Sequence, residues 1–319
     1  MTPVFHWDNG LKLTKADLAI DVRRRQPRAF ISHAHADHIA RHQYALCTPE
    51  TAALYHFRLG RRPTLEMPYR QPVEWGGLRL TTYPAGHCLG SAMLLAEDGE
   101  QSLLYTGDFK LGESATAERA ELARADVLVI ESTYGHPDYR LPPREQAVEQ
   151  LLDEVRKTLE AGAVPVVEAY ALGKGQEVTR LLTGAGFPVL QHKHVYETSR
   201  VYESLGVDLG QYDRLRGDVA PGSVLVVPPR TPRFDNLARE VRFAVTGWAV
   251  GRGAKYRFRV DHAIPLSDHA DYEELLEAIG RVAPRKVYCT HGPESFVDRV
   301  RDAGFDAHPL GRPSQGRLF

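Results

Sequence analysis

The chain has 319 residues, of which 43% are hydrophobic and 25% are charged, and its formal net charge at pH 7 is −1. This composition predicts a folded protein with a sizeable core and excludes an intrinsically disordered chain. It also excludes a protein that coats nucleic acid through overall basicity, and the length fits one large domain or one domain with a second inserted into it.

No apolar stretch approaches the roughly 18 residues that a membrane-spanning helix needs, and residues 1–21 lack the pattern of a signal peptide. The three cysteines, Cys47, Cys88 and Cys289, are an odd number without paired spacing. We therefore expect neither a disulfide framework nor a cysteine-rich zinc site. These features favour a cytoplasmic protein with no membrane association.

Short apolar runs bounded by Gly, Pro or Asp, which are typical of β-strands, recur through the first half of the chain. They cover residues 29–32, 78–83, 92–96, 103–106 and 127–131. Several run directly into His, Asp or Glu. Polar side chains are thus expected at strand ends, where layered α/β proteins commonly build their sites.

After residue 134 the pattern changes to alternating helix and strand, which predicts a separate α/β unit. We expect helices at residues 144–161 and 175–183, and strands at residues 164–169, 224–227 and 241–246. The last part of the chain, residues 256–319, returns to strands that end in histidine, at residues 264–269 and 286–291.

The strongest chemical signal is the motif HAHADH at residues 33–38, directly after an apolar strand. Alternate side chains of an extended segment share one face, so His33 and His35 can reach one metal ion. The turn that follows would direct Asp37 and His38 to a second ion. With 14 histidines in 319 residues this pattern is improbable by chance, and it predicts a metal site.

Two further side chains complete a set for two metal ions. His87 lies in PAGHCLGS at residues 84–91, where glycines permit a tight loop that presents one imidazole. Asp108 lies in YTGDF at residues 105–109, at a strand end where one carboxylate can bridge two cations. Each residue alone is more often structural, but their order after the histidine-rich motif favours metal binding.

These residues together resemble the ordered ligand motifs of the metallo-β-lactamase superfamily. The matching positions are His33, His35, Asp37, His38, His87 and Asp108. Asp21, which follows the apolar run at residues 18–20, looks like that family's first motif, a carboxylate that orients the metal ligands from behind.

Four further stretches resemble motifs of the β-CASP branch of this superfamily, which cleaves nucleic acid. ESTYG at residues 131–135 is similar to the acidic motif that opens the cap region. ALGKGQE at residues 171–177 is similar to the cap's Gly-x-x-Gln-Glu stretch, with Lys174 where Arg is common. LSDHADY at residues 266–272 resembles motif B, and CTHG at residues 289–292 resembles motif C.

The resemblance implies a two-metal hydrolase that uses Zn²⁺ or Mn²⁺. It assigns one ion to His33, His35 and His87, and the other to Asp37, His38 and His291, with Asp108 between them. It also implies that His269, positioned by Glu131, protonates the departing sugar oxygen, and it counts Asp37 among the catalytic residues.

Residues 214–259 hold ten Lys and Arg against three Asp and Glu, a local positive charge in a nearly neutral chain. We therefore expect Arg252 and Arg257 to bind substrate. Lys174 and Ser132, which lie in the motif stretches, are expected to join them. A solvated basic face and a simple turn role for Ser132 stay open as alternatives.

Within the nuclease interpretation, His291 favours RNA, because the DNA repair members of the branch usually carry Val in motif C. The compact length, the opening DNGL at residues 8–11 and the motif at residues 266–271 instead resemble the bacterial DNA ligase-associated exonucleases, which keep this His. We therefore expect an exonuclease that acts on single-stranded DNA in DNA repair, with a ribonuclease as the alternative. Association with a DNA ligase or helicase is implied by the resemblance alone.

Two other classes are less favoured. A hydrolase of small esters or thioesters would not need an insertion of about 120 residues, which is the size of a domain. A binding module with structural zinc would use a closed shell rich in thiolates. We therefore expect an α/β protein with a four-layer αββα metallo-β-lactamase sandwich at residues 1–135 and 259–319, and an inserted α/β β-CASP cap at residues 136–258.

Overall fold

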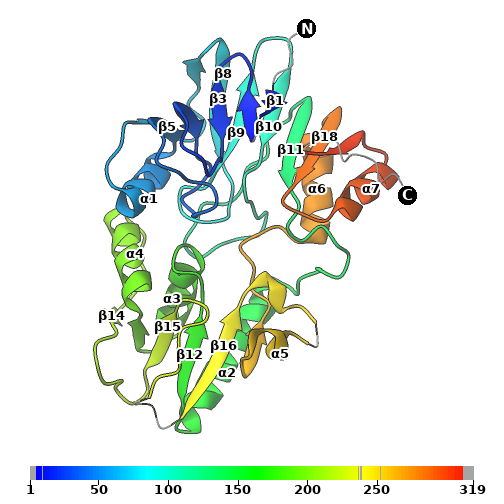
Figure 1. Cartoon of the computed structure of the whole chain (residues 1–319). Coiled ribbons are helices and arrows are strands. Elements are labelled where there is room, and N and C mark those ends of the chain that lie inside the picture. The colour runs from blue at the N-terminus through cyan, green and yellow to red at the C-terminus, as the bar shows by residue number, and fades with distance from the viewer. Residues whose placement is uncertain (1–4, 9, 236, 238, 252, 312–319) are drawn as a thin grey trace. The chain divides into compact units, whose positions relative to one another are not determined.

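The computed structural model describes residues 5–8, 10–235, 237, 239–251 and 253–311. The chain forms two compact units (Figure 1). Unit 1 comprises Met1–Leu111, Glu118–His136 and Tyr272–Phe319, and unit 2 comprises Gly112–Ala117 and Pro137–Asp271. Among the helices of the described residues, none has both the length and the apolarity that crossing a bilayer requires.

Unit 1 contains two mixed β-sheets. The first has six strands in chain order: β1 (Phe5–Trp7), β2 (Leu11–Leu13), β3 (Leu18–Ile20), β4 (Arg28–Phe30), β5 (Tyr44–Cys47) and β6 (Thr64–Glu66). The second has seven, in the order β19 (Ala307–Pro309), β18 (Lys286–Thr290), β11 (Val127–Glu131), β10 (Ser102–Tyr105), β9 (Ala92–Glu97), β8 (Leu78–Pro84) and β7 (Val73–Trp75). In each sheet, antiparallel strands at one end meet parallel strands at the other.

The two sheets share one hydrophobic core. Alternate side chains of a strand point to opposite faces of its sheet, so each strand contributes every second residue to this core. Leu46 of β5 belongs to the same buried cluster as Leu94 of β9 and Leu103 of β10. The sheets therefore lie face to face.

Helices lie outside this pair of sheets. Cys47, the neighbour of Leu46 in β5, faces away from the shared core and clusters with Tyr55 of α1 (Pro49–Leu59). Beside the second sheet, α6 (Tyr272–Val282) and α7 (Glu294–Asp302) lie next to β18 (Figure 1). The predicted four-layer αββα sandwich is confirmed.

Unit 2 is built on one parallel sheet of six strands. Their order is β14 (Tyr212–Arg214), β13 (Val189–Gln191), β15 (Val224–Val227), β12 (Val164–Glu168), β16 (Glu240–Val245) and β17 (His262–Ile264). On one face, α2 (Arg144–Glu160), α3 (Lys174–Gly184) and α4 (Lys193–Ser204) share a core with the strands. On the other face, partly buried residues from the segments after β14 and β15, such as Val219 and Phe234, pack against Val166 and Leu225.

Most expected elements of both halves are confirmed. The strands expected at residues 127–131 and 224–227 are β11 and β15, and the helix expected at residues 144–161 is α2, which ends at Glu160. The strand expected at residues 264–269 is wrong, because β17 covers His262–Ile264 and ends where the expected strand begins. Pro265 has no N–H for a further hydrogen bond to the neighbouring strand. Since β17 pairs with β16, the chain stays in unit 2 through Asp271 and returns to unit 1 at Tyr272 rather than at residue 259.

Candidate metal centre

The HAHADH motif is held in place by helix α1. The motif follows β4 and has no regular secondary structure. It turns at residues 36–38, where the His38 N–H donates to the His35 carbonyl at 3.1 Å. Ala34 is fully buried, and its carbonyl accepts a hydrogen bond from Arg58 of α1 at 2.6 Å. The histidines on either side of Ala34 therefore project from an anchored backbone.

The loop that presents His87 depends on glycine. Gly86 has φ of 78°, in the left-handed region that favours glycine, and a Cβ there would lie 2.3 Å from the carbonyl oxygen of Lys110. The His87 N–H donates to Ser91 Oγ at 3.1 Å, which closes the loop. The glycines that the sequence placed around His87 thus have a steric reason.

The first group of ligand atoms comes from His33, His35, His87 and Asp108, all in unit 1. His33 Nε2 and His87 Nε2 each lie 3.0 Å from His35 Nδ1. Asp108 Oδ2 lies 3.5 Å from His33 Nε2 and 3.9 Å from His87 Nε2. Tetrahedral bonds of about 2.0–2.1 Å place ligand atoms about 3.3 Å apart. These four side chains therefore fit one divalent metal ion.

The second group comes from His38, Asp108 and His291. Asp108 Oδ2, the same oxygen that faces the first group, lies 3.3 Å from His38 Nε2, and the ring of His291 is centred 5.6 Å from that of His38. The expected ligand Asp37 is not part of this group, although its Oδ2 lies 3.9 Å from His38 Nε2. One carboxylate is thus shared between two sets of histidines.

Asp21 orients the second group from behind. Its carboxylate accepts hydrogen bonds from the Ser32 N–H at 2.8 Å, the Ser32 hydroxyl at 2.5 Å and the Tyr105 hydroxyl at 2.8 Å. His38 Nδ1 lies 2.9 Å from the same carboxylate, which leaves Nε2 of that ring facing Asp108. Ser32 and Tyr105 were not among the expected site residues. The signal that points to them is their position at the ends of strands leading into the ligand motifs.

Changing Asp21 to Asn is expected to lower metal affinity by about 10–100-fold, since a residue that orients a ligand typically contributes that much. The amide keeps the size of the side chain but weakens its hold on His38 and on the Tyr105 hydroxyl. Competition with a zinc-binding dye measures the affinity. Asp302→Asn, at an exposed position on α7, is the matched control. Equal affinity in the Asp21 variant and the control would rule out the orienting role.

The electrostatics of the centre favour a bound cation. Burial, aided by the neighbouring His38, holds the pKa of His33 well below its ordinary value, so this imidazole keeps the lone pair that a metal ligand needs. Burial also acts to lower the pKa of His38, but the carboxylates of Asp108 and Asp21 outweigh it and raise that pKa well above its ordinary value. The carboxylates thus favour positive charge beside His38, and a metal ion supplies it.

His291 has an unusual backbone conformation that its neighbours fix. Its φ is 56°, a left-handed value that costs energy for a residue with a side chain. Gly292 follows, and a Cβ there would lie 2.0 Å from the carbonyl oxygen of Ser132. Ser132, an expected substrate contact, is buried, and its hydroxyl donates to the Thr290 carbonyl at 3.0 Å. In this structure Ser132 therefore positions the loop that carries His291.

Glu131 plays a similar part for the loop of Asp108. Its buried carboxylate accepts the N–H of Phe109 at 3.0 Å through Oε1 and the N–H of Thr133 at 3.2 Å through Oε2. Since Phe109 follows Asp108 directly, these bonds fix the backbone beside the shared carboxylate.

Lys174, also an expected substrate contact, lies in the interior of unit 2. Its side chain is 1% exposed, and its Nζ lies 2.9 Å from Glu177 and 4.0 Å from Asp268. Arg144 of α2 bonds the other oxygen of Glu177 at 2.8 Å. Burial acts to lower the pKa of Lys174, but Asp268 and Glu177 outweigh it and raise its pKa. Lys174 therefore connects α3 to the segment that carries His269.

Changing Lys174 to Met is expected to destabilise the protein by about 3–5 kcal/mol, because it removes the buried cation that lies between the carboxylates of Glu177 and Asp268. Chemical denaturation measures the loss. Lys157→Met is the matched control, since Lys157 is 66% exposed and its ion pair on α2 faces solvent. A Lys174 variant as stable as this control would show that the buried ion pair contributes little.

Two further expected residues, His269 and Arg257, lie in unit 2. His269 lies between β17 and α6, where its N–H donates to Ser267 Oγ at 2.9 Å. Arg257 lies on α5 (Ala254–Phe258), and its guanidinium donates to the Trp248 carbonyl. Arg252 lies outside the described residues.

Comparisons with known proteins agree with this geometry. A family described as RMMBL, a Zn-dependent metallo-hydrolase RNA specificity domain, matches residues 255–308. A probable DNA ligase of Opitutus terrae is 37% identical over 324 residues, which cover 98% of this chain and 32% of the ligase. The 5' exonuclease Apollo of Gallus gallus is 29% identical over 303 residues, which cover 88% of this chain and 63% of Apollo. The chain thus spans less than two thirds of the length of either relative.

A solved structure resembles most of the fold. It is the crystal structure of a protein of unknown function from Enterococcus faecalis, 14% identical, with a TM-score of 0.63. The alignment covers 89% of this chain and 79% of that one. At this identity the likeness concerns the fold alone.

Proposed function

We infer that this chain, which belongs to the β-CASP nuclease branch of the metallo-β-lactamase superfamily, hydrolyses phosphodiester bonds in nucleic acid with two bound divalent metal ions. The observation that carries this inference is the carboxylate of Asp108. Its Oδ2 lies 3.5 Å from His33 Nε2 and 3.3 Å from His38 Nε2, which belong to different ligand groups. A carboxylate between two sets of histidines suits a pair of cations that act on one phosphate.

Two divalent ions, when bound, supply Lewis acidity, lower the pKa of water and offset the negative charge that develops on the phosphate. The chain's own residues fix the geometry. Asp21 orients the ring of His38, and burial keeps His33 neutral. Glu131 and Ser132 hold the loops of Asp108 and His291 by hydrogen bonds between their side chains and the backbone of those loops. The ligand atoms are therefore held in place before substrate binds.

For His269 we propose the role of general acid, as the resemblance of residues 266–272 implies. A histidine in this role gives a proton to the departing sugar oxygen and commonly contributes 10²–10⁴-fold to the rate. For Asp37 we propose that it completes the ligand set of His38 and His291. Its carboxylate lies 3.9 Å from His38 Nε2, beside this group.

Single-stranded DNA is the proposed substrate, with exonuclease action in DNA repair. The similarity to a probable DNA ligase along 98% of this chain supports DNA and an association with a ligase, because the chain corresponds to about one third of that protein. The 29% identity to a 5' exonuclease supports action at a strand end. RNA is the second candidate, favoured by His291 and by the match of residues 255–308 to an RNA specificity domain.

The ions are proposed to be Zn²⁺ or Mn²⁺. Histidine nitrogens and carboxylate oxygens suit both metals, and the matching family is described as Zn-dependent.

A substrate panel tests the function. Protein loaded with Zn²⁺ or with Mn²⁺ is incubated with end-labelled single-stranded DNA, RNA of the same sequence, duplex DNA and a chromogenic thioester. The expected result is stepwise shortening of the single-stranded DNA, faster than that of the RNA. Faster shortening of the RNA would select the second candidate. Hydrolysis of the thioester without cleavage of any nucleic acid would overturn the nuclease proposal.

A further inference from the structure

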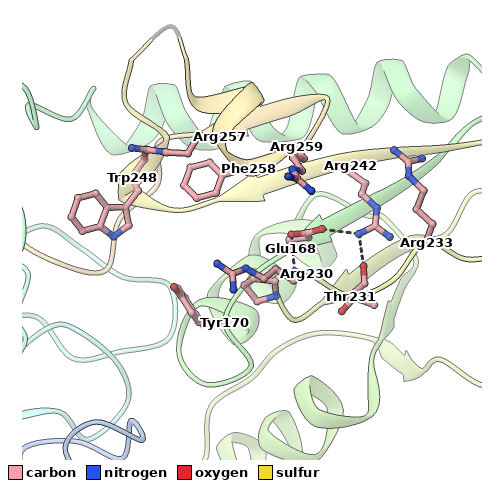
Figure 2. A pocket seen from close by; sticks show the side chains of 11 residues that line it. Glu168, Tyr170, Arg230, Thr231, Arg233, Arg242, Trp248, Arg257, Phe258 and Arg259 are labelled. Carbon is pink, nitrogen blue, oxygen red and sulfur yellow. Dashed lines mark hydrogen bonds and ion pairs between the residues drawn. The ribbon is translucent and has the colours of Figure 1, made fainter.

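Unit 2 contains a pocket of about 1170 Å³, and none of its lining residues belongs to the candidate metal centre. Its walls come from the ends of β12 and β15, from β16, and from the segments that follow β16, which are the 3-10 helix η1 (Gly247–Ala249) and α5. Figure 2 shows the side chains of Tyr170, Arg230, Trp248 and Arg259 around this hollow. The volume exceeds the roughly 300–1,000 Å³ of pockets for a single small molecule, so it suits a longer ligand.

The pocket lies where the topology of a parallel sheet favours ligand binding. β12 and β16 are neighbours, but the chain leaves them in opposite directions. After β12 it passes through α3 to β13, and after β16 it passes through α5 to β17. Such a divergence opens a crevice at the carboxyl ends of the strands, where α/β folds bind their ligands. Tyr170 follows β12 and Trp248 follows β16, so both lie at this crevice.

The pocket carries excess positive charge. Five arginines and one glutamate are among its lining residues. The glutamate, Glu168, is already engaged, since it accepts Arg242 Nη1 at 2.7 Å and the Arg230 N–H at 3.1 Å. Arg242 is itself buried and bonded to the carbonyls of Thr231 and Pro232. These contacts neutralise the charge of Glu168 and Arg242. Arg233 pairs with Glu240 at 3.1 Å, so it is also engaged.

Arg230 and Arg259 are the side chains best placed for such a ligand. Both are exposed, and within the part of the chain that the structure describes neither has an ion-pair partner. Both have left-handed backbone conformations, with φ of 64° and 56°. Exposed guanidinium groups that converge on a pocket suit phosphate, which they bind with two parallel hydrogen bonds.

Aromatic side chains accompany these arginines. Tyr170 is 57% exposed in the pocket, and Trp248 and Phe258 also line it. Arg257 lies over the ring of Phe258, 4.8 Å from its centroid. Exposed aromatic rings beside a basic surface are typical of proteins that bind single strands, because an unpaired base stacks on the ring while phosphates contact the cations. A duplex hides its base faces and cannot use such a ring.

We propose that this pocket binds a segment of single-stranded nucleic acid, with its phosphates held by Arg230 and Arg259 and an unpaired base stacked on Tyr170. The inference rests on the proposed function and adds a site for the strand within unit 2.

Binding by the full chain tests this site. Fluorescence anisotropy is measured with labelled oligo(dT) and oligo(U) in EDTA, which prevents cleavage by removing metal ions. The pocket is expected to stay intact, because none of its residues is a proposed metal ligand. Arg230→Ala combined with Arg259→Ala is expected to raise Kd about tenfold and to lower the slope of log K against log salt by about 1.4, because each phosphate contact with a single strand contributes about 0.7. Tyr170→Ala is expected to raise Kd about tenfold with the slope unchanged.

The control is Arg156→Ala on α2, where Arg156 is 52% exposed, and it is expected to bind as wild type does. Equal binding by the pocket variants and this control would overturn the proposal. Equally tight binding of duplex DNA, or full displacement of the oligonucleotide by the same concentration of AMP, would also overturn it in favour of a different ligand.

The two proposals fail in different ways. If the metal-loaded wild type cleaves no nucleic acid, the proposed function fails. If it cleaves single strands and the pocket variants show the wild-type KM, the pocket proposal alone fails.

Discussion

Changing Asp108 to Ala is expected to remove both metal ions and to slow phosphodiester hydrolysis by about three orders of magnitude, since metal ions contribute several kcal/mol of transition-state stabilisation. The reason is the shared position of its carboxylate. Asp108 Oδ2 lies within 3.5 Å of ring nitrogens from both ligand groups. Without it, both groups lose their common anionic ligand, and no carboxylate between the two cations offsets their mutual repulsion.

Metal content after dialysis, measured by mass spectrometry, gives a readout that does not depend on activity. Initial rates on single-stranded DNA give the second. The matched control is Asp302→Ala, an exposed position at the end of α7. It is expected to keep two ions per chain and the wild-type rate. An Asp108 variant that also keeps two ions would show that the carboxylate is not their bridge.

The sequence predicted most of the side chains that the structure brings together in the candidate metal centre, because they lie in short, dense motifs. Four ligand-type side chains fall within the six residues 33–38, and local backbone geometry alone brings them near one another. His87 and Asp108 come from distant strands, and their prediction relied on their order in the chain. The structure joins them to His35 and His33 at distances of 3.0 and 3.5 Å.

Packing determined what the sequence could not predict. The motif of Lys174 predicts a substrate contact, but the carboxylates of Glu177 and Asp268 hold this side chain in the interior. Ser132 faces the Thr290 carbonyl because β11 and β18 pair in parallel, a contact between residues 158 positions apart. The end of unit 2 likewise depends on β17 pairing with β16, and a three-residue strand gives little signal in the sequence. Each of these features depends on a contact between residues far apart in the sequence, namely Lys174 with Asp268, Ser132 with Thr290, and β17 with β16.

Changing His35 to Ala is expected to remove one metal ion and to spare the other. His35 belongs to the first ligand group, where its Nδ1 lies 3.0 Å from both His33 Nε2 and His87 Nε2, and it is absent from the group of His38, Asp108 and His291. Loss of one nitrogen from the first group weakens that ion, while the second group keeps all of its members. Hydrolysis is still expected to fall by about three orders of magnitude, because chemistry at a phosphate between two cations needs both of them.

The metal content of the two variants therefore separates the two groups: about one ion per chain for His35→Ala and none for Asp108→Ala. His308→Ala is the matched control, since His308 lies in β19 and bonds the exposed Asp306 at 2.7 Å, away from both groups. It is expected to keep two ions and full activity. If His35→Ala also lost both ions, the two groups would form one cooperative site rather than two sites with a shared carboxylate. If it cleaved DNA at the wild-type rate, the first group would have no part in the chemistry.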